Sequence, residues 1–388
     1  MVWILIRGGY VLMTNILRAL SASGAVAGTI SGMSWGNNNR GQLGLGNTTN
    51  YSSPVMIGEK DTWSQVAKGY ETSMAAKSDG TLWGWGRSQV GQLGLGNTTS
   101  YSSPVQVGAL TTWLKPIMGY GTTFSTKTDG TLWAWGNNNS GQLGLGDKTN
   151  RSSPVQVGSL TTWSMVGAGQ WNGMAVKTDG TLWAWGSNGS GQLGQGDMTG
   201  RSSPVQVGAL TTWANVTGGG EFAIAAKTDN TIWTWGENGL GELGLGDTSR
   251  RSSPVQVGSL TTWSDDANKI ACTGTSTWAV KTDGTLWGWG ENSKGELGLG
   301  NTTAYSSPVQ VGSLTNWSRV YGFPWVAKEH FVAIKTDGTL WACGDNSSGQ
   351  LGQGNTTAYS SPVQVGSLTT WLEADAGYGA NTALEGPA

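Results

Sequence analysis

The sequence has few of the residue types on which most catalytic and metal sites depend. Its 388 residues include one histidine, His330, and two cysteines, Cys272 and Cys343. Two cysteines are too few for a disulfide framework and lack the paired spacing of a zinc site, so we interpret them as small buried apolar residues. The sequence contains no nucleophile elbow, phosphate-binding loop or metal-spaced cluster. We therefore expect no catalytic residues, no metal and no cofactor, and predict that the protein is not an enzyme.

Charge is also scarce. Only 12% of the residues are charged, the formal net charge is −2, and the sequence has no lysine or arginine run. The electrostatic footprint of a nucleic-acid binder or of a polybasic membrane anchor is therefore missing, and we expect neither partner. Near the start, Arg7, Gly8 and Arg18 interrupt the apolar stretches, so none is long enough to span a membrane. We interpret residues 1–28 as an extension that is partly disordered or read from an upstream start, with Met13 as an alternative start.

Glycine and tryptophan, in contrast, are abundant, at 64 and 23 residues. This suits short strands joined by tight turns, with tryptophan between sheets. The tripeptide SSP and the turn motif GQLG or GELG each occur seven times in one register, at intervals of 50 residues and, in the last two cases, 54. The prolines are Pro54, Pro104, Pro154, Pro204, Pro254, Pro308 and Pro362, and the first glycines are Gly41, Gly91, Gly141, Gly191, Gly241, Gly295 and Gly349. Seven copies of such a unit are enough to close a ring.

One unit, residues 163–207, divides into four strand candidates at residues 163–169, 173–178, 181–186 and 204–207. Asp179 and Gly180 supply the tight turn between the second and third. In the third, Trp183 and Trp185 share one face while leucine and alanine occupy the other, so both faces must be covered, as in stacked blades. Proline at the head of the fourth strand places it at the outer edge of a blade. The first strand, rich in glycine and alanine, then lies at the crowded axis.

The two ends of the chain each carry half a unit. The chain ends with two inner strands and begins, after residue 28, with two outer ones. We therefore predict an all-β fold, a seven-bladed β-propeller of four-stranded antiparallel blades, closed by N-terminal strands that complete the C-terminal blade. The predicted single domain covers residues 29–388, with blades at about 63–107, 113–157, 163–207, 213–257, 263–311, 317–365, and 371–388 plus 29–57.

The repeat resembles that of the regulator of chromosome condensation family. The resemblance rests on residues 135–146, WGNNNSGQLGLG, and 179–186, DGTLWAWG, and it covers residues 29–388. It implies a seven-bladed propeller and interaction rather than catalysis, since such propellers include exchange factors for small GTPases and a β-lactamase inhibitor. Units of this family often place a histidine where His330 stands, so it is interpreted as a remnant of the repeat. The sequence shows no basic tail for DNA binding, and the units are too short to contain a long inserted wedge. We therefore rank nucleotide-exchange activity below protein binding.

In an up-and-down meander, alternate loops share a face. The nearly identical KTDG and GSLTT turns are predicted on one face, which we call the invariant face. The inner loop after the first strand and the long GQLG connection are predicted on the other, the variable face. Its aromatic residues form a candidate binding ring for a protein or a sugar, with capping of the core as the alternative. These candidates are Tyr70, Tyr120, Trp171, Phe222, Tyr321, Phe323, Trp325 and Tyr378.

Two positions in the long connection change together from copy to copy. Three copies carry Asp and Arg, and four carry Asn and Tyr. We predict that the two positions touch within each blade, as an ion pair or as an Asn–Tyr contact. The arginines are further candidates for binding. The pairs are Asp147/Arg151, Asp197/Arg201, Asp247/Arg251, Asn47/Tyr51, Asn97/Tyr101, Asn301/Tyr305 and Asn355/Tyr359.

The predicted inner strands of the fifth and seventh blades carry acids, namely Asp265, Asp266, Glu373 and Asp375. Such acids could serve hydrolysis or bind Ca²⁺, but solvated or ion-paired side chains near the channel are the preferred interpretation. Arg319, at the corresponding position of the sixth blade, is expected to line the channel between two acids.

These patterns favour a non-enzymatic protein-binding or assembly scaffold that uses the variable face, in a virion or extracellular setting suggested by low charge and polar composition. The alternative is a lectin-like propeller that binds glycans. A guanine-nucleotide exchange factor and a hydrolase or lyase rank behind both.

Overall fold

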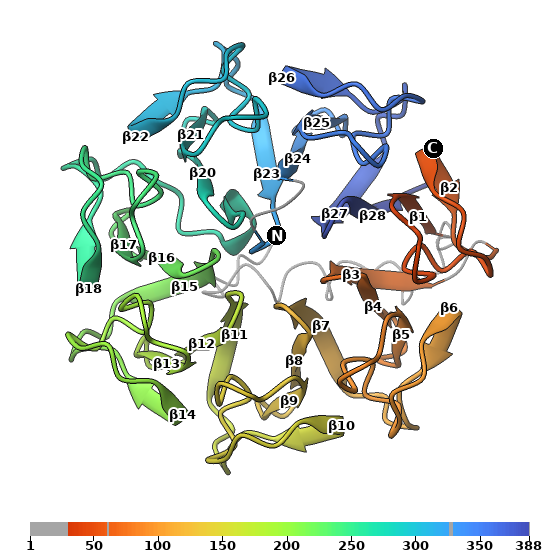
Figure 1. Ribbon diagram of the computed structural model, residues 1–388, viewed down its shortest axis with the longest axis horizontal. Coiled ribbons are helices and arrows are strands. Elements are labelled where there is room, and N and C mark those ends of the chain that lie inside the picture. Colours follow the sequence, from red (N-terminus) through yellow and green to blue (C-terminus); the bar gives the residue numbers. More distant parts are fainter. Residues whose placement is uncertain (1–29, 60–61, 326–328, 388) are drawn as a thin grey trace, which may run out of the picture.

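The computed structural model describes residues 30–59, 62–325 and 329–387. Within these ranges it contains 28 strands and one short 3₁₀ helix. The strands form seven four-stranded antiparallel sheets around a central axis, as Figure 1 shows. This confirms the predicted seven-bladed propeller. The extension predicted for residues 1–28 lies outside the described ranges, and no helix in those ranges is long and apolar enough to cross a membrane.

The blades are numbered in chain order, and each is given from the axis outwards. Blade 1 is β3 (Trp63–Lys68), β4 (Thr72–Lys77), β5 (Leu82–Gly86) and β6 (Tyr101–Gln106); blade 2 is β7 (Trp113–Met118), β8 (Thr122–Lys127), β9 (Leu132–Gly136) and β10 (Arg151–Gln156); blade 3 is β11 (Trp163–Ala168), β12 (Asn172–Lys177), β13 (Leu182–Gly186) and β14 (Arg201–Gln206); blade 4 is β15 (Trp213–Gly218), β16 (Phe222–Lys227), β17 (Ile232–Gly236) and β18 (Arg251–Gln256).

The remaining blades include two with longer units and one built from both ends of the chain. Blade 5 is β19 (Ile270–Cys272), β20 (Ser276–Val280), β21 (Leu286–Gly290) and β22 (Tyr305–Gln310), preceded by the 3₁₀ helix η1 (Ala267–Lys269); blade 6 is β23 (Trp317–Tyr321), β24 (His330–Lys335), β25 (Leu340–Gly344) and β26 (Tyr359–Gln364); blade 7 is β27 (Trp371–Ala376), β28 (Ala380–Glu385), β1 (Ser31–Gly36) and β2 (Tyr51–Met56).

The predicted hairpin turn forms between the second and third strands of each complete blade. In blade 3, Asp179 Oδ1 accepts hydrogen bonds from Thr181 N at 2.9 Å and Thr181 Oγ1 at 2.6 Å. Gly180 has a φ of 76°, a left-handed conformation that glycine adopts without strain. In blade 4, Asn230 takes this place with a φ of 62°. Asparagine tolerates this conformation better than most residues, which explains the one exception to the Asp-Gly pattern.

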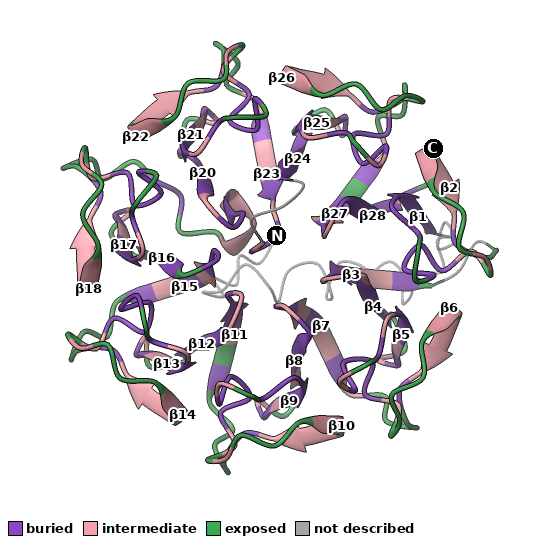
Figure 2. Ribbon diagram, viewed as in Figure 1, coloured by how far each residue is buried: buried purple, intermediate pink, exposed green. Residues whose placement is uncertain are grey.

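Tryptophans fill the space between neighbouring blades. Trp185 is fully buried and packs against Trp163, with ring centroids 6.2 Å apart. Its Nε1 donates to the carbonyl of Gln142 in the GQLG motif of the preceding blade, at 2.8 Å. A Cβ on Gly144 in that motif would lie 2.9 Å from Trp185 Nε1, so the glycine is required by this close approach. The repeated motif thus links each blade to the next. In Figure 2 the middle strands of the blades are the most buried, and the outermost strands at the rim are the least buried.

The chain closes the ring as predicted. Strand β1 pairs with β28 over six residues, from Ser31 opposite Glu385 to Gly36 opposite Ala380. Figure 1 shows β1 and β2 in the same blade as β27 and β28. Trp35 is fully buried there and donates from Nε1 to the carbonyl of Gln350 in blade 6, at 2.9 Å. No open sheet edge remains between the first and last units.

Blade 5 departs from the predicted inner strand. Trp263 keeps its place through a bridge to Lys281, but the chain then forms η1, and β19 begins only at Ile270. Asp266 caps η1 by accepting a hydrogen bond from Asn268 N at 2.9 Å. The prediction that Asp265 and Asp266 lie on an inner strand was therefore wrong. Four additional residues before the strand shift its register, and Ile270 occupies the position predicted for Asp266 because it pairs with Ala279 as Val166 pairs with Ala175.

Candidate functional site

The variable face gathers the loops that differ among the blades. In blade 3, Asn172 pairs with Gly186, and Gly186 pairs with Arg201. The inner loop before Asn172 and the long connection between Gly186 and Arg201 therefore lie at the same end of the sheet. The other blades repeat this register, so the predicted division into two faces is correct.

Five aromatic side chains on this face meet at the propeller axis. Tyr120 stacks on Trp325 with ring centroids 4.2 Å apart and an interplanar angle of 11°. Tyr120 also contacts Tyr70 at 4.6 Å and Trp171 at 4.7 Å, and Tyr70 contacts Tyr378 at 4.7 Å. All five side chains are half-buried. We call Tyr70, Tyr120, Trp171, Trp325 and Tyr378 the central aromatic cluster.

Three of the predicted aromatic candidates do not lie on this surface. Phe222 is the first residue of β16 and is fully buried with Trp263 and Trp289. Tyr321, the last residue of β23, and Phe323 are also buried, and both line the channel below the face. The error has a simple cause. Phe222 occupies the strand position of Thr72, one residue beyond the inner loop. Tyr321 still belongs to β23, and Phe323 follows it by two residues.

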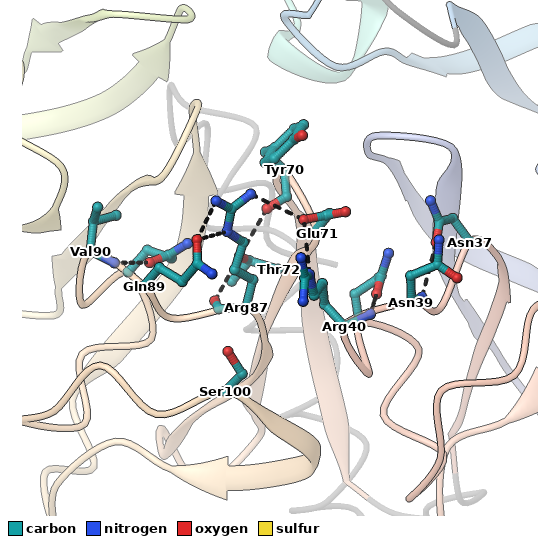
Figure 3. A network of polar contacts seen from close by, with 12 residues as sticks. Asn37, Asn39, Arg40, Tyr70, Glu71, Thr72, Arg87, Gln89, Val90 and Ser100 are labelled. Atoms are coloured by element: carbon teal, nitrogen blue, oxygen red, sulfur yellow. Dashed lines mark hydrogen bonds and ion pairs between the residues drawn. The ribbon is translucent and has the colours of Figure 1, made fainter.

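A group of charged residues that sequence reasoning missed borders the cluster. Glu71 Oε2 lies 3.1 Å from Arg87 Nη1 and 3.8 Å from Arg40 Nε. The Arg87 guanidinium lies 5.3 Å from the ring centroid of Tyr70. Figure 3 shows this network at the edge of the variable face. A comparison of the charged residues among the seven copies could have identified it. Glu71, Arg87 and Arg40 occupy three different positions of the repeat, and each of these positions has a counterpart in every other unit.

Blades 5 and 6 hold a cluster of carboxyl groups on the same face. One carboxylate oxygen from each of Glu291, Glu296 and Glu329 lies within 4.8 Å of the others. Burial, together with the charge of Glu296, raises the pKa of Glu329 to about 8, and burial raises the pKa of Glu296 to about 7. Thr275 Oγ1 donates to Glu291 at 2.7 Å and to Glu329 at 2.9 Å. Oxygen ligands of this kind suit hard cations, so among the residues that the structure describes these three form the group that could hold a metal ion.

The two positions that change together do touch. Arg151, Arg201 and Arg251 form ion pairs with the aspartates four residues earlier, at 2.5, 2.7 and 2.6 Å. In the four other copies, an asparagine Nδ2 lies 3.3 to 3.4 Å from the tyrosine hydroxyl oxygen. The contact prediction is thus confirmed. These arginines tie down the start of the outer strands, and their use in binding stays a prediction.

The channel below the face contains the remaining predicted charges. Lys115 Nζ lies 2.6 Å from Glu373 Oε1, an ion pair between blades 2 and 7. Arg319 Nη1 donates to the carbonyl of Leu372 at 2.5 Å. Burial lowers the pKa of Lys68 to about 7 and raises the pKa of Asp375 to about 7. The preferred interpretation of ion-paired residues near the channel therefore fits Glu373.

His330 has a structural environment. It is buried at the start of β24, and its Nε2 lies 2.8 Å from Asn381 Oδ1 in β28. Asn381 Nδ2 in turn donates to the carbonyl of Gln350 at 2.5 Å. This chain of contacts joins blades 6 and 7 beside the closing strands, and it provides no exposed general base.

Comparison with curated proteins finds short matches. Mouse protein RCC2 is 38% identical over 87 residues, which is 22% of this chain and 16% of that protein. The probable human E3 ubiquitin-protein ligase HERC6 is 36% identical over 100 residues, 25% of this chain and 10% of that protein. The matched stretches thus span less than a fifth of either relative.

Solved structures match over nearly the whole chain. Human WBSCR16 has a TM-score of 0.80 and 20% identity, and the match covers 92% of this chain and 99% of that chain. Yeast RCC1 (Prp20), solved with Kap60 bound, has a TM-score of 0.80 and 17% identity, covering 93% and 90%. At such identities the likeness shows the fold alone.

The family model for the regulator of chromosome condensation (RCC1) repeat matches seven consecutive stretches. They are residues 34–76, 79–124, 129–176, 179–226, 229–280, 283–322 and 337–384. Together with the seven blades, these matches show that the chain belongs to the RCC1 repeat family.

Proposed function

We propose that this protein is a non-enzymatic binding module whose variable face engages another protein through the central aromatic cluster. The observation that carries the proposal is the meeting of five half-buried aromatic rings at the axis of a face whose loops differ from blade to blade. Tyrosine and tryptophan are enriched at the centres of protein interfaces, where a few large side chains supply most of the binding energy.

The surroundings of the cluster support this proposal. The loops that carry the rings sit on short, buried inner strands, so the surface is held by a rigid scaffold. Arg87, Arg40 and Glu71 provide a polar border on one side. An apolar centre with a polar rim is the usual arrangement of protein interfaces. Proteins of similar fold are described with protein partners: Prp20 with bound Kap60, and Prp20p by its binding to Gsp1p and histones.

A glycan-binding propeller is a weaker candidate because of how the rings pack. A sugar stacks on the open face of an aromatic ring, one platform at a time. Here Tyr120 and Trp325 stack on each other, and Tyr70 contacts both of these residues as well as Tyr378. The rings form one packed patch rather than separate platforms in each blade. Exchange activity on a small GTPase ranks behind simple binding, because the low identities to the structural relatives carry over the fold and no activity.

A capture experiment with matched variants tests the proposal. The tagged protein and two variants are incubated with lysates, and bound proteins are quantified by mass spectrometry. The test variant is Trp171→Ala/Trp325→Ala, and the control is Leu160→Ser/Leu210→Ser, which alters exposed residues on the invariant face. We expect a partner that the wild type and the control retain and the test variant loses. A partner retained by the test variant as well would refute the proposal.

Two parallel assays separate the alternatives. A glycan array probed with the wild type and with Trp171→Ala would support the lectin hypothesis if a sugar bound the wild type and not the variant. Release of fluorescent GDP from small GTPases, accelerated by the wild type, would show exchange activity. Under our proposal both assays are silent, while the capture experiment identifies a protein.

A further inference from the structure

Three equivalent positions of each unit meet on the variable face. They are the last residue of the inner loop, the first residue after the third strand, and the residue before the GQLG motif of the preceding blade. In blade 1 these positions hold Glu71, Arg87 and Arg40, and the two arginines face the one carboxylate. Figure 3 shows them side by side. In blade 1, therefore, two cations at these positions neutralise the one acid.

At the same positions in blades 4, 5 and 6 the acids outnumber the cations, because Lys294, which precedes the GELG motif before blade 6, is the one lysine or arginine among them. In blade 4 they are Glu221, Glu237 and Ser190, and Ser190 Oγ donates to Glu221 Oε2 at 2.6 Å and to Glu237 Oε2 at 3.2 Å. Only Glu237 has an ion-pair partner there, Arg250. Two carboxylates thus share one hydroxyl where blade 1 places guanidinium groups.

Blades 5 and 6 repeat the imbalance. Glu291 of blade 5 and Glu329 of blade 6 both accept hydrogen bonds from Thr275 Oγ1. Among the described residues, neither of these acids nor Glu221 has a lysine or arginine nitrogen within 4.0 Å. We call Glu221, Glu291 and Glu329 the acidic arc. The acidic arc runs over three consecutive blades, blades 4 to 6, of the variable face.

The acidic arc adjoins the central aromatic cluster. Trp325 and Glu329 lie in the same inner loop of blade 6, and the carbonyl of Trp325 accepts a hydrogen bond from Gly274 N, next to Thr275, at 3.3 Å. Trp171 and Glu221 hold equivalent positions in the adjacent blades 3 and 4. The half-buried rings therefore have a carboxylate border on the side of blades 4 to 6, and the Arg40–Glu71–Arg87 network on the side of blade 1.

We propose that the cluster and the acidic arc form one docking surface for a protein segment that carries arginine or lysine beside an aromatic or apolar side chain. The partner's cations pair with Glu221, which is exposed, and with Glu291, which is half-buried, as Arg40 and Arg87 pair with Glu71. Glu329 is buried, and Thr275 Oγ1 links it to Glu291, so it supports Glu291 rather than meeting the partner. Arginine is suited to this because its planar fork pairs with carboxylates and its face stacks on aromatic rings. This inference rests on the proposed function and adds the chemistry of the partner.

Two synthetic peptides test the charge requirement. One carries arginines on both sides of a single tryptophan, and the other carries glutamate in place of each arginine; both are labelled with fluorescein and followed by fluorescence anisotropy. We expect the arginine peptide alone to bind, and its affinity to fall as salt is raised, since screening weakens exposed charge pairs. The variant Glu221→Gln/Glu291→Gln/Glu329→Gln should weaken binding about tenfold or more.

The control variant changes the same number of acidic residues elsewhere. Glu59→Gln/Asp265→Asn/Glu385→Gln alters acids away from the variable face and should bind the arginine peptide as the wild type does. Should the triple arc variant fail to fold, Glu221→Gln alone, at an exposed position, should still weaken binding. Equal binding of the two peptides, or equal loss in the control variant, overturns the inference.

Calcium distinguishes a second possibility. If CaCl₂ stabilises the wild type but not the arc variant and displaces the peptide, the arc is a metal site and the inference fails. Failure of this inference can also be told apart from failure of the proposed function. If a captured partner is lost by Trp171→Ala/Trp325→Ala but retained by the arc variant, the proposed binding face stands and the inference of a cationic partner segment fails.

Discussion

Tyr120 of blade 2 and Trp325 of blade 6 stack at the propeller axis, with ring centroids 4.2 Å apart. Their loops are distant in the sequence and meet because all inner strands end near one axis and the ring is closed. The two interpretations of these aromatic residues are a surface for binding and a cap of the core. Both rings are half-buried, which favours a surface.

Trp325→Ala tests this interpretation through stability. The substitution removes the contacts of Trp325 with Tyr70 and Tyr120, and each aromatic pair contributes about 0.5–1.5 kcal/mol beyond its buried area. We expect the free energy of unfolding to fall by about 1–2 kcal/mol in urea titrations. Phe331→Ala, at a fully buried position, serves as the reference and should cost about 3–5 kcal/mol. Equal losses in the two variants would show that the cluster caps the core.

Glu329→Gln should remove a pH dependence of stability. The pKa of Glu329, about 8 in the folded protein, lies above the ordinary value of 4.5 for a glutamate side chain. The folded state therefore retains a proton that the unfolded state releases between these values, so the group's contribution is full below pH 4.5 and is lost as the pH rises through about 8. Thermal unfolding of the variant should match the wild type at pH 5 and occur at a higher temperature at pH 8.5. Equal unfolding temperatures of the variant and the wild type at both pH values would contradict this prediction.

The two versions of the long connection should be interchangeable when both positions change. Asp197→Asn/Arg201→Tyr converts the blade 3 ion pair into the Asn–Tyr contact found in four other copies. We expect thermal unfolding within about 2 °C of the wild type, since exposed ion pairs contribute little. Arg201→Tyr alone pairs tyrosine with Asp197 and should be less stable than the double variant. A single variant as stable as the double variant would indicate that the positions share only a history of duplication.

Trp35→Ala should be as damaging as the same change inside an unbroken blade. Trp35 and Trp185 are both fully buried and donate to the carbonyl of a GQLG glutamine in the preceding blade. Replacing a buried tryptophan with alanine costs about 3–5 kcal/mol. Midpoints of urea unfolding should therefore fall by similar amounts for Trp35→Ala and Trp185→Ala. A much smaller effect at Trp35 would mean that the closing blade contributes little to stability.

Much of the fold could be predicted because the same sequence pattern occurs in all seven units. The tryptophans, the Asp-Gly turn and the SSP tripeptide recur in one order at intervals of 50 or 54 residues, so an assignment made for residues 163–207 applied to most of the other units. The half units at the two ends then predicted the pairing of β1 with β28. The coupled change at Asp197 and Arg201 predicted their contact in the same way, because seven copies within one chain serve as internal comparisons.

The errors arose where one copy departs from the others. Trp263 keeps its place while four additional residues follow it, so the position of Asp266 could not be inferred from spacing alone. Phe222 was assigned by its aromatic character rather than by its register, which makes it the first residue of a buried strand. The convergence of Tyr70, Tyr120 and Trp325 depends on how far each loop reaches over the axis, and this is set by packing among blades that are not neighbours in sequence.

Closure of the ring by its two ends is the claim on which both the fold and the binding face depend, because the inner loops converge only in a closed circle. Ser34 and Thr382 are directly paired across this seam, with hydroxyl oxygens 3.4 Å apart. Oxidation of Ser34→Cys/Thr382→Cys, followed by mass spectrometry of a proteolytic digest, tests the pairing most directly. We predict a disulfide between the two residues and none between the introduced cysteines of Ser34→Cys/Thr123→Cys, which places the second cysteine in β8 of blade 2. Failure of the first pair to crosslink, or equal crosslinking of the two, would contradict the closed propeller.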